Sequence, residues 1–410
     1  MQKRSEKEYL ISVPDLDQYA LKSEMRRIQV HDRGIKIMLP KAQFRTVKIK
    51  DLPVTQANII KQDMLSFGGD AATAMGTINH SIKKTDILIF GTLQQFKNLT
   101  SKLKHQYFGL KNIAGRIDEA LGDNDRTPKP MKIGGKTFDF NKRTYIMGIL
   151  NVTPDSFSDG GKYINFNDAV AHGRKMIEDG ADIIDVGGES TRPGATPVSA
   201  AEEIKRVIPV IKELAKVKGA VISIDTTKSP VAEAAIKAGA SMINDVSALR
   251  FDKKIAKVAA RHNAALVLMH MLGNPRVMQE NPVYGDLISD IISCLQNSVS
   301  IAIKGGVRQN RIIVDPGFGF GKIVEHNLEI LRRLKELKAL GSPVMIGTSR
   351  KSTIGKVLGL PPDKRLEGTA ATVTAAIAGG ANFVRVHDVE EMSRVAKMAD
   401  SIYRKQGMKK

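Results

Sequence analysis

Short apolar runs that end in polar or glycine-rich residues recur along the last two thirds of the chain. Each has the composition of a buried β-strand and a length in the expected range of about four to eight residues. Segments with the period of an amphipathic helix separate them. The eight runs are Tyr145–Leu150, Ala181–Gly187, Val221–Thr226, Met242–Val246, Ala265–His270, Ile312–Gly317, Val344–Ser349 and Phe383–Asp388; the helical segments include Ala200–Lys216, Pro230–Lys237, Asp286–Lys304, His326–Leu337 and Leu366–Ala378.

This alternation of strand and helix predicts parallel βαβ units. Eight such units in sequence favour an α/β fold of the TIM (β/α)8 barrel type, with an open doubly wound sheet as the alternative. In either fold, binding and catalytic groups belong at the carboxyl ends of the strands.

The region before the barrel has its own pattern. It predicts strands at Gly34–Leu39, Phe44–Ile49 and Asp86–Phe90, and helices at Thr55–Ser66 and Leu93–His105. Gly68 and Gly69 are interpreted as a helix stop and His80 as a surface residue. We therefore expect a small α/β domain whose role the sequence does not give.

A breaker-rich segment, residues 122–130, predicts a linker. Met131–Phe140 then alternates around Gly134 and Gly135, which predicts a β-hairpin that could plug the bottom of the barrel. The expected organisation is a small α/β domain at 1–125, a linker and hairpin at 126–144, and the barrel at 145–405.

Composition narrows the function classes. The chain has 410 residues and 42% hydrophobic content, enough for two cores, and a single cysteine, Cys294, which excludes disulfides within the chain and a cysteine-built metal site. No apolar run has membrane-spanning length, and the basic amino terminus lacks an apolar segment behind it, so we expect a cytoplasmic protein that binds no membrane. The net charge of +20 comes from scattered Lys and Arg with only 5% aromatic residues, which argues against nucleic-acid binding.

The loop after the first barrel strand, residues 151–161, is rich in polar groups. Asn151 and Asp159 offer two hard oxygen ligands for a cation, and Gly160 and Gly161 allow the loop to bend over a ligand. The loop after the second strand presents the Thr191 hydroxyl and the Arg192 guanidinium to an anion, although it could be an ordinary turn.

Several other strands also end in polar residues. Asp225, Asn244 and Asp315 follow the third, fourth and sixth strands. A single strand-end Asp is as often a helix cap as a ligand, but a set that converges on one barrel mouth is costly to bury without partners.

Basic groups follow the last two strands. Arg350 and Lys351 could form a solvated pair, and His387 could be an ordinary core histidine, but Arg385 shares its strand face. Ser352 is expected to open a helix, where free backbone N–H groups can hold an anion.

These loops, taken in order, resemble the motifs of the dihydropteroate synthase family. The resemblance covers roughly residues 131–402, with Thr348 where the family commonly has Met. The motifs are Met147–Gly161, Gly180–Gly194, Ser223–Thr226, Ile243–Asp245, Met269–Pro275, Asp315–Lys322, Thr348–Ser352 and Arg385–Val389.

The resemblance implies condensation of a dihydropterin methyl diphosphate with 4-aminobenzoate, which gives dihydropteroate and diphosphate in folate synthesis. It implies Mg2+ held by Asn151 and Asp159, and it also implies catalytic roles for Asp159, Lys351, Arg385 and His387. The phosphates would contact Thr191, Arg192, Arg385 and His387. The pterin would contact Asp225, Asn244, Asp315 and Lys351. The aminobenzoate would contact Ser352, Phe157 and Pro193, and Phe320 is a further substrate-binding residue. We also expect a homodimer.

The implied mechanism needs no nucleophilic side chain. Diphosphate departure leaves a methylene cation conjugated with the pterin, magnesium and the basic groups stabilise the leaving anion, and the two loops exclude water. A methyltransferase that passes a methyl group from a folate to a corrinoid, and a non-catalytic pterin or RNA binder, remain alternatives.

Overall fold

The computed structural model describes residues 11–125, 127–153, 166–190, 197–273, 278 and 282–404. The chain divides into two compact units, Met1–Leu121 and Gly122–Lys410. Each unit has its own hydrophobic core, so the two are described separately.

The first unit is a three-stranded antiparallel sheet with helices packed against it. The strand order is β1-β3-β2, and Val47 of β1 is paired with Ile89 of β3. Its core joins α3, α4 and α5 to the sheet through residues such as Ile60, Ile89 and Leu99. The elements are α1 (Gln18–Arg27), α2 (Asp32–Met38), β1 (Phe44–Pro53), α3 (Val54–Ser66), β2 (Asp70–Thr73), β3 (Lys84–Thr92), α4 (Leu93–Leu103) and α5 (Leu110–Asp125).

Two predictions for this region were wrong. The predicted strand at 34–39 is helix α2, because the His31 side chain caps its first turn and only Ile35 is buried, so the alternating apolar residues line no sheet. The predicted linker starts too early, because α5 continues through Gly122 to Asp125. Strands β1 and β3 and helices α3 and α4 lie where they were predicted.

The second unit is a parallel eight-stranded barrel, which confirms the predicted fold class. The order β11-β10-β9-β8-β7-β6-β13-β12 runs once around the barrel, and a parallel bridge between Val314 and Val344 joins its two ends. The strands are β6 (Tyr145–Asn151), β7 (Ile183–Gly187), β8 (Ile222–Asp225), β9 (Met242–Asp245), β10 (Ala265–Met269), β11 (Ile312–Asp315), β12 (Met345–Ile346) and β13 (Phe383–Val386).

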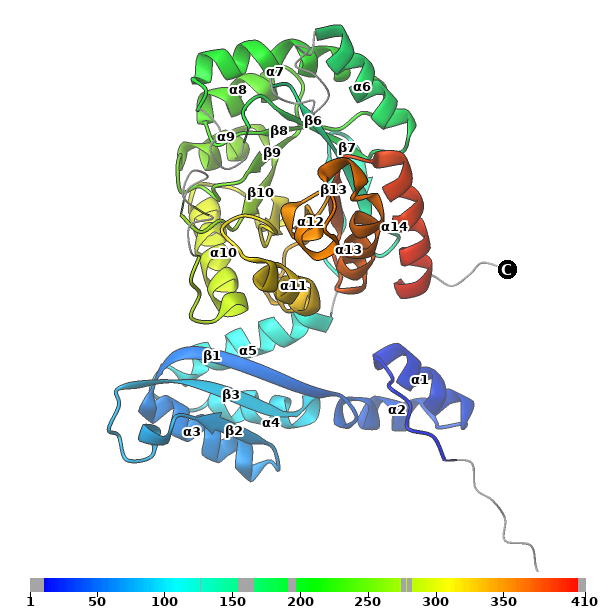
Figure 1. Cartoon of the computed structure of the whole chain (residues 1–410). Coiled ribbons are helices and arrows are strands. Elements are labelled where there is room, and N and C mark those ends of the chain that lie inside the picture. The colour runs from blue at the N-terminus through cyan, green and yellow to red at the C-terminus, as the bar shows by residue number, and fades with distance from the viewer. Residues whose placement is uncertain are drawn as a thin grey trace, which may run out of the picture. The chain divides into compact units, whose positions relative to one another are not determined.

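Helices surround these strands, as Figure 1 shows. They are α6 (Phe166–Glu178), α7 (Ala200–Leu214), α8 (Ser229–Lys237), α9 (Lys254–His262), α10 (Leu287–Lys304), α11 (Val324–Arg333), α12 (Ser352–Leu358), α13 (Leu366–Ala378) and α14 (Val389–Tyr403). Residues such as Ile184, Ile222 and Val384 face these helices and build the larger core cluster. Alternate strand residues face the barrel interior instead.

The amino-terminal end of the barrel is filled with apolar side chains. The hairpin of β4 (Met131–Ile133) and β5 (Lys136–Phe138) turns at Gly134 and Gly135, whose positive φ angles of 54° and 80° suit glycine. Met131 and Phe138 share one cluster with strand residues such as Tyr145 and Phe383. The hairpin therefore covers this end of the interior.

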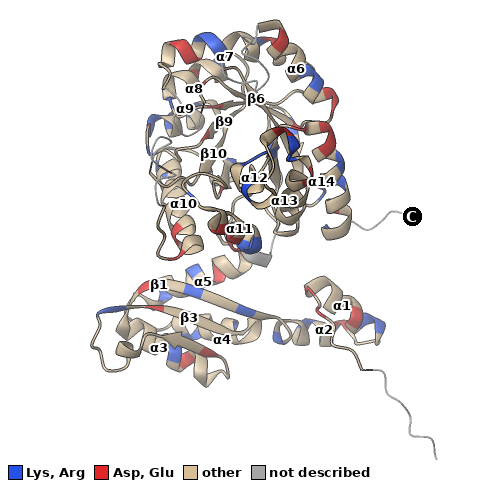
Figure 2. Ribbon diagram, in the orientation of Figure 1, with Lys and Arg blue, Asp and Glu red and all other residues tan. Residues whose placement is uncertain are grey.

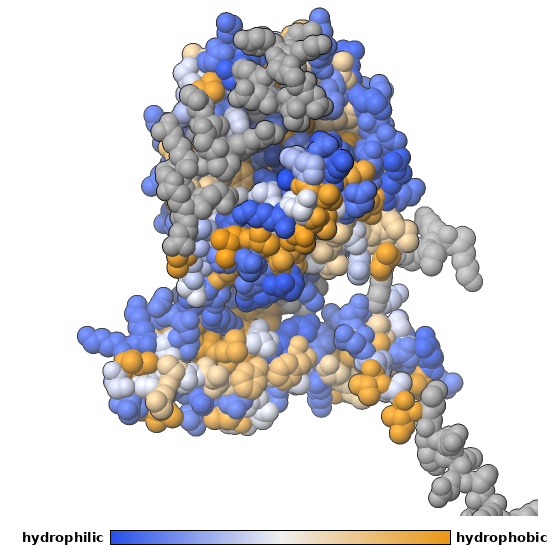
Figure 3. Space-filling model, viewed as in Figure 1, coloured by the Kyte–Doolittle hydropathy of each residue, from blue (hydrophilic) through white to orange (hydrophobic). Residues whose placement is uncertain are grey.

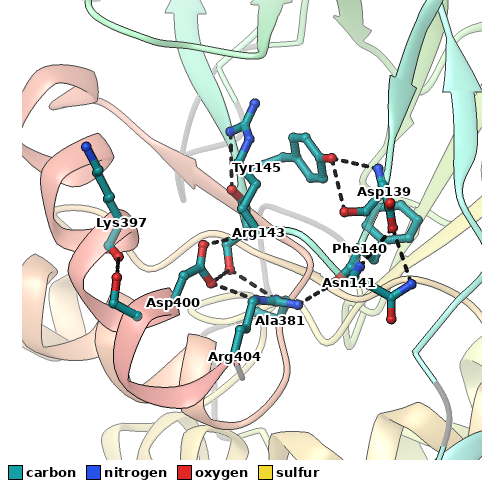
Figure 4. A network of polar contacts seen from close by, with 11 residues as sticks. Asp139, Phe140, Asn141, Arg143, Tyr145, Ala381, Lys397, Asp400 and Arg404 are labelled. Atoms are coloured by element: carbon teal, nitrogen blue, oxygen red, sulfur yellow. Dashed lines mark hydrogen bonds and ion pairs between the residues drawn. The ribbon is translucent and has the colours of Figure 1, made fainter. Parts of the chain in front are cut away.

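A polar network seals the same end (Figure 4). Asp400 accepts hydrogen bonds from the Thr144 backbone N–H at 2.7 Å and from the Thr144 hydroxyl at 2.8 Å. Arg404 donates to Asp400, to the Phe140 carbonyl and to the Ala381 carbonyl, each at 2.6 Å. The network joins the segment before the first barrel strand to the last helix.

Both acidic and basic residues occur on the outer helices (Figure 2), and some of them form ion pairs. Examples are Lys175 with Asp179, Arg206 with Glu202 and Arg394 with Glu390. Hydrophobic residues reach the surface near α12, where Val357 and Leu358 are exposed, and Figure 3 shows an orange area over this part of the barrel. Among the described residues, no helix is long and apolar enough to cross a lipid bilayer.

Candidate active site

A pocket opens at the carboxyl ends of the barrel strands. It combines carboxylate, amide and basic side chains with an apolar wall, as small-molecule sites commonly do. Its lining residues are Ile149, Asp225, Asn244, Val246, Met269, Asp315, Phe318, Phe320, Gly347, Ser349, Lys351 and Arg385. The pocket thus brings together the predicted pterin residues Asp225, Asn244, Asp315 and Lys351, with the predicted substrate residue Phe320.

Arg385, from β13, lies between two carboxylates. Its Nε donates to Asp185 Oδ2 and one Nη donates to Asp225 Oδ2, both at 2.7 Å. Burial lowers the pKa of the guanidinium, but the two carboxylates more than reverse this, so Arg385 stays charged. These bonds use two of the five N–H groups of an arginine, and the others can reach an anion.

The pKa of Asp225 is set by opposing effects. Burial raises its pKa, the Arg385 guanidinium opposes that rise, and the neighbouring Asp185 carboxylate adds to it. Two carboxylates therefore share one cation at the base of the pocket, which gives this region a negative bias that favours a cationic ligand.

Asp315 ends β11 and is held by the turn that follows. Its Oδ1 accepts the Gly317 backbone N–H at 2.6 Å. Gly317 has a φ of +69°, and a Cβ there would lie 1.8 Å from the His270 carbonyl oxygen, so only glycine fits this turn. Burial raises the pKa of Asp315 to about 6, so near neutral pH it is ionised but easily protonated.

A buried basic pair supports the same turn. Lys322 Nζ lies 3.0 Å from His270 Nδ1 and donates to the Phe320 carbonyl at 2.9 Å. Burial lowers the pKa of Lys322 to about 7 and that of His270 to about 2. His270 is therefore neutral and can accept a hydrogen bond from Lys322.

The basic pair after β12 divides into two roles. Arg350 turns outward and bonds to Asp388, with its Nε 3.0 Å from Oδ2. Lys351 lines the pocket, and its Nζ lies 4.2 Å from the centre of the Phe320 ring, a cation–π contact. Ser352 begins helix α12, as predicted.

His387 lies behind Ser349. The Ser349 hydroxyl oxygen accepts the His387 backbone N–H at 3.2 Å and lies 3.0 Å from His387 Nδ1. The Ser349 hydroxyl can donate its proton to Nδ1, and in that arrangement the ring proton lies on Nε2. Burial, reinforced by Arg385, lowers the pKa of His387 to about 3, so it acts as a neutral donor.

The candidate metal ligands are only partly described. Asn151 ends β6, and a Cβ added at Gly187 would lie 3.5 Å from Asn151 Oδ1 and 3.9 Å from Asp225 Oδ2, so both residues flank the same edge of the mouth. Asp159 lies outside the described residues, as do Phe157, Thr191, Arg192 and Pro193. Within the described part of the chain, no three His, Cys, Asp or Glu side chains form a metal-binding group. One amide oxygen beside substrate phosphates and water still suits Mg2+, which takes few protein ligands in such sites.

Comparison with known proteins gives the family. The model of the family described as pterin binding enzymes matches residues 147–387. The dihydropteroate synthase of Synechocystis is 50% identical over 282 residues, which span 68% of this chain and 98% of that protein. The chain belongs to the dihydropteroate synthase family.

Two further relatives extend the comparison. The crystal structure of the Clostridium difficile dihydropteroate synthase, obtained with pteroic acid, has a TM-score of 0.61 and 52% identity, and covers 65% of this chain and 100% of that chain. A protein of Halobacterium salinarum, described as a probable bifunctional folylpolyglutamate synthase/dihydropteroate synthase, is 40% identical over 380 residues, 92% of this chain and 45% of its own length. That match is longer than the barrel unit, so the similarity reaches into the first unit.

Sequence reasoning missed Asp185, which joins two pocket residues of this dihydropteroate synthase family member. Asp185 is fully buried on β7 and bonds to Arg385 and Asn244. The sequence feature that could have identified Asp185 is an acidic residue inside the apolar run Ile183–Gly187. Alternate residues of a barrel strand face the interior, and Asp185 is at such a position. Asp245, next to Asn244, caps the following turn through Ser247 and Leu249 and does not line the pocket.

Proposed function

We propose that the pocket binds the pterin of a dihydropterin methyl diphosphate and that the chain joins it to 4-aminobenzoate. The observation that carries this assignment is a set of buried acceptors with unmet capacity. Asn244 Oδ1 is buried without a hydrogen-bond partner among the described residues, and the Asp315 carboxylate faces the same pocket. A pterin edge offers adjacent N–H donors for both, and Lys351 can donate to its carbonyl oxygen.

The diphosphate is assigned to the basic groups at the end of β13 and to the loops at the mouth. Arg385 has N–H groups left for it, and His387 can donate from Nε2 without adding charge. Thr191 and Arg192 are proposed to bind the same anion, and Asn151 with Asp159 to hold Mg2+ on it. The metal, when bound, neutralises charge on the leaving diphosphate.

The aminobenzoate is proposed to bind outside the pterin. Ser352 at the start of α12, with Phe157 and Pro193, forms this subsite in the proposal. The Clostridium difficile relative was crystallised with pteroic acid, which contains both a pterin and an aminobenzoate, and this supports adjacent subsites.

The proposed reaction forms one C–N bond and breaks one C–O bond. Diphosphate leaves with the bonding electrons, and the methylene cation that remains is conjugated with the pterin ring. Asp225 and Asp315 stabilise that positive charge, while Arg385, His387 and Lys351 donate to the anionic or carbonyl oxygens. The aminobenzoate nitrogen then attacks the methylene carbon and loses its proton.

The test is product analysis with the full chain, the pterin diphosphate and labelled 4-aminobenzoate. We expect labelled dihydropteroate and one diphosphate per product, and loss of turnover when a chelator removes divalent ions. Turnover that is unchanged by exhaustive chelation would contradict the metal assignment. Methylation of a corrinoid without dihydropteroate would favour the methyltransferase alternative.

The oligomeric state and the cellular location of the protein are also predicted. A homodimer is expected, and the exposed apolar residues near α12 are compatible with a subunit contact. Sedimentation of the full chain tests it. Cytoplasmic location is expected from the sequence and needs cell fractionation.

A further inference from the structure

Asp185 lies beneath the pocket and outside its lining. It is fully buried, in the middle of β7. Its Oδ2 accepts a hydrogen bond from Asn244 Nδ2 at 2.8 Å and another from Arg385 Nε at 2.7 Å. One carboxylate oxygen thus holds two side chains that do line the pocket.

The contact fixes the orientation of the Asn244 amide. A primary amide has a donating and an accepting end of similar shape, and rotation by 180° exchanges them. In the opposite orientation, Asn244 Oδ1 would face the Asp185 carboxylate, and two acceptors would meet in a buried site. Because Nδ2 is committed to Asp185, Asn244 offers Oδ1, which has no partner among the described residues.

We propose that Asp185 is a positioning residue that selects for ligands with an N–H donor facing Asn244. It acts through the Asn244 amide and does not touch the ligand. The inference rests on the proposed pterin site, which it deepens by naming the residue that sets its hydrogen-bond pattern. A ligand with an acceptor at that point would meet the Asn244 oxygen and be rejected.

A simpler role for Asp185 is to neutralise Arg385. The two roles predict different coupling between the effects of substituting Asp185 and Asn244 on pterin affinity. If Asp185 acts through Asn244, removing Asp185 has no further effect once the Asn244 amide is gone. If it only balances charge or supports the barrel, the two losses add.

A double-mutant cycle separates the two roles, with 6-hydroxymethylpterin as the probe and calorimetry as the measurement. We expect Asp185→Ala to weaken binding by about tenfold, and the double variant with Asn244→Ala to bind no more weakly than Asn244→Ala alone. Asp185→Asn keeps an acceptor oxygen and should restore binding to within about threefold of the parent chain. Additive losses in the cycle would overturn the proposal.

Asp182→Ala is the matched control. Asp182 is another buried aspartate, next to the same strand, and it pairs with Arg143 and Lys136 at the opposite end of the barrel. Its loss should lower thermal stability without changing pterin affinity. An equal loss of affinity in both aspartate variants would show a general packing effect and would also overturn the proposal.

The cycle distinguishes this inference from the proposed function. If Asn244→Ala alone binds pterin normally, the pterin assignment fails. If Asn244→Ala loses binding but the cycle is additive, only the role of Asp185 fails.

Should Asp185→Ala not fold, the parent chain supplies a second measurement. With 15N-labelled asparagine, the Asn244 side-chain NH2 should exchange slowly before any pterin is added, because Asp185 already holds it. Fast exchange that slows only on addition of pterin would overturn the proposal.

Discussion

The two ends of the barrel treat buried aspartates in opposite ways. At the amino-terminal end, Asp182 accepts from both Arg143 Nη groups at 2.7 and 2.6 Å, from Lys136 Nζ at 2.7 Å and from the Ile146 backbone N–H at 3.1 Å. Burial alone would raise the pKa of Asp182, but these partners hold it below its ordinary value. Three residues later, Asp185 uses one oxygen only, and its Oδ1 is buried without a partner among the described residues.

The two ends of the barrel therefore serve different purposes: one stabilises the fold and the other binds a ligand. The closed end satisfies its polar groups within the chain, so it contributes to folding. The open end keeps acceptors with unmet capacity and raises the pKa of Asp315 to about 6, which costs stability in the free protein. A ligand that supplies donors to Asn244 and Asp315, which line the pocket, recovers part of that cost as binding energy.

The closed end should give the largest change in stability. Asp182→Ala removes the acceptor of Arg143, Lys136 and the buried Ile146 backbone N–H; because both cations keep access to water, we expect a loss on the order of 2 to 3 kcal/mol. Chemical denaturation should show this loss, while the folded fraction still binds pterin with the affinity of the parent chain. Normal stability would mean that the two ends do not differ as described.

The open end should give a large loss of binding without a loss of folding stability. Asp315→Ala removes an ionised acceptor from a desolvated site, which weakens pterin binding by about 2 to 4 kcal/mol. Calorimetry with 6-hydroxymethylpterin measures the affinity, and thermal unfolding provides the control. Retained affinity in a folded variant would remove Asp315 from the pterin site.

The two ends should respond to pH with opposite signs. The folded pKa of Asp182 is lowered, so its contribution is present above the ordinary value of 3.8 and is lost as pH falls below it. The folded pKa of Asp315 is raised from 3.8 to about 6, so this group opposes folding above that range and ceases to do so as pH falls through it.

Asp315→Asn tests this sign. It should raise the free energy of unfolding at pH 7 by on the order of 1 to 3 kcal/mol, a gain that fades toward pH 4. Asp182→Asn should instead lower the free energy of unfolding at pH 7. Denaturation curves at several pH values measure the free energy of unfolding of both variants. If both substitutions change it in the same direction at pH 7, the proposed contrast between the two ends is wrong.

The smallest effect is expected from the first unit. Deletion of residues 1–121 follows the boundary between the two compact units and leaves the barrel core clusters complete. The shortened chain should unfold cooperatively and keep pterin affinity within about twofold, because both ends of the barrel lie in the second unit. A large loss of pterin affinity or of cooperative unfolding would show that the first unit completes one end of the barrel.

The sequence predicts the barrel well because each strand is an isolated apolar run with a polar end. All eight predicted runs became strands, and Leu366–Ala378 became helix α13 with the predicted bounds. Helix α2 was missed because the alternation of Ile35 and Ile37 looks like a strand when the His31 cap is not considered. Helix α5 was missed because Gly122 and the polar residues after it resemble a linker.

Site prediction followed the same logic. Residues at the strand ends, such as Asp315 and Lys351, could be placed at the mouth because parallel strands bring their carboxyl ends together. Asp185 could not be assigned a partner, since its contacts with Asn244 and Arg385 span 59 and 200 residues of sequence. The outward turn of Arg350 toward Asp388 could not be predicted either, because it goes with a left-handed φ of 55° at Arg350.

The network around Arg404 bears on how the protein is made. The bonds from Thr144 to Asp400 and from Arg404 to Phe140 join residues 256 and 264 positions apart. A ribosome must therefore complete nearly the whole barrel before this end can be sealed. Until then, the aromatic side chains of Phe140 and Tyr145 lack their contact with Phe383, and the nascent chain leaves this apolar surface exposed.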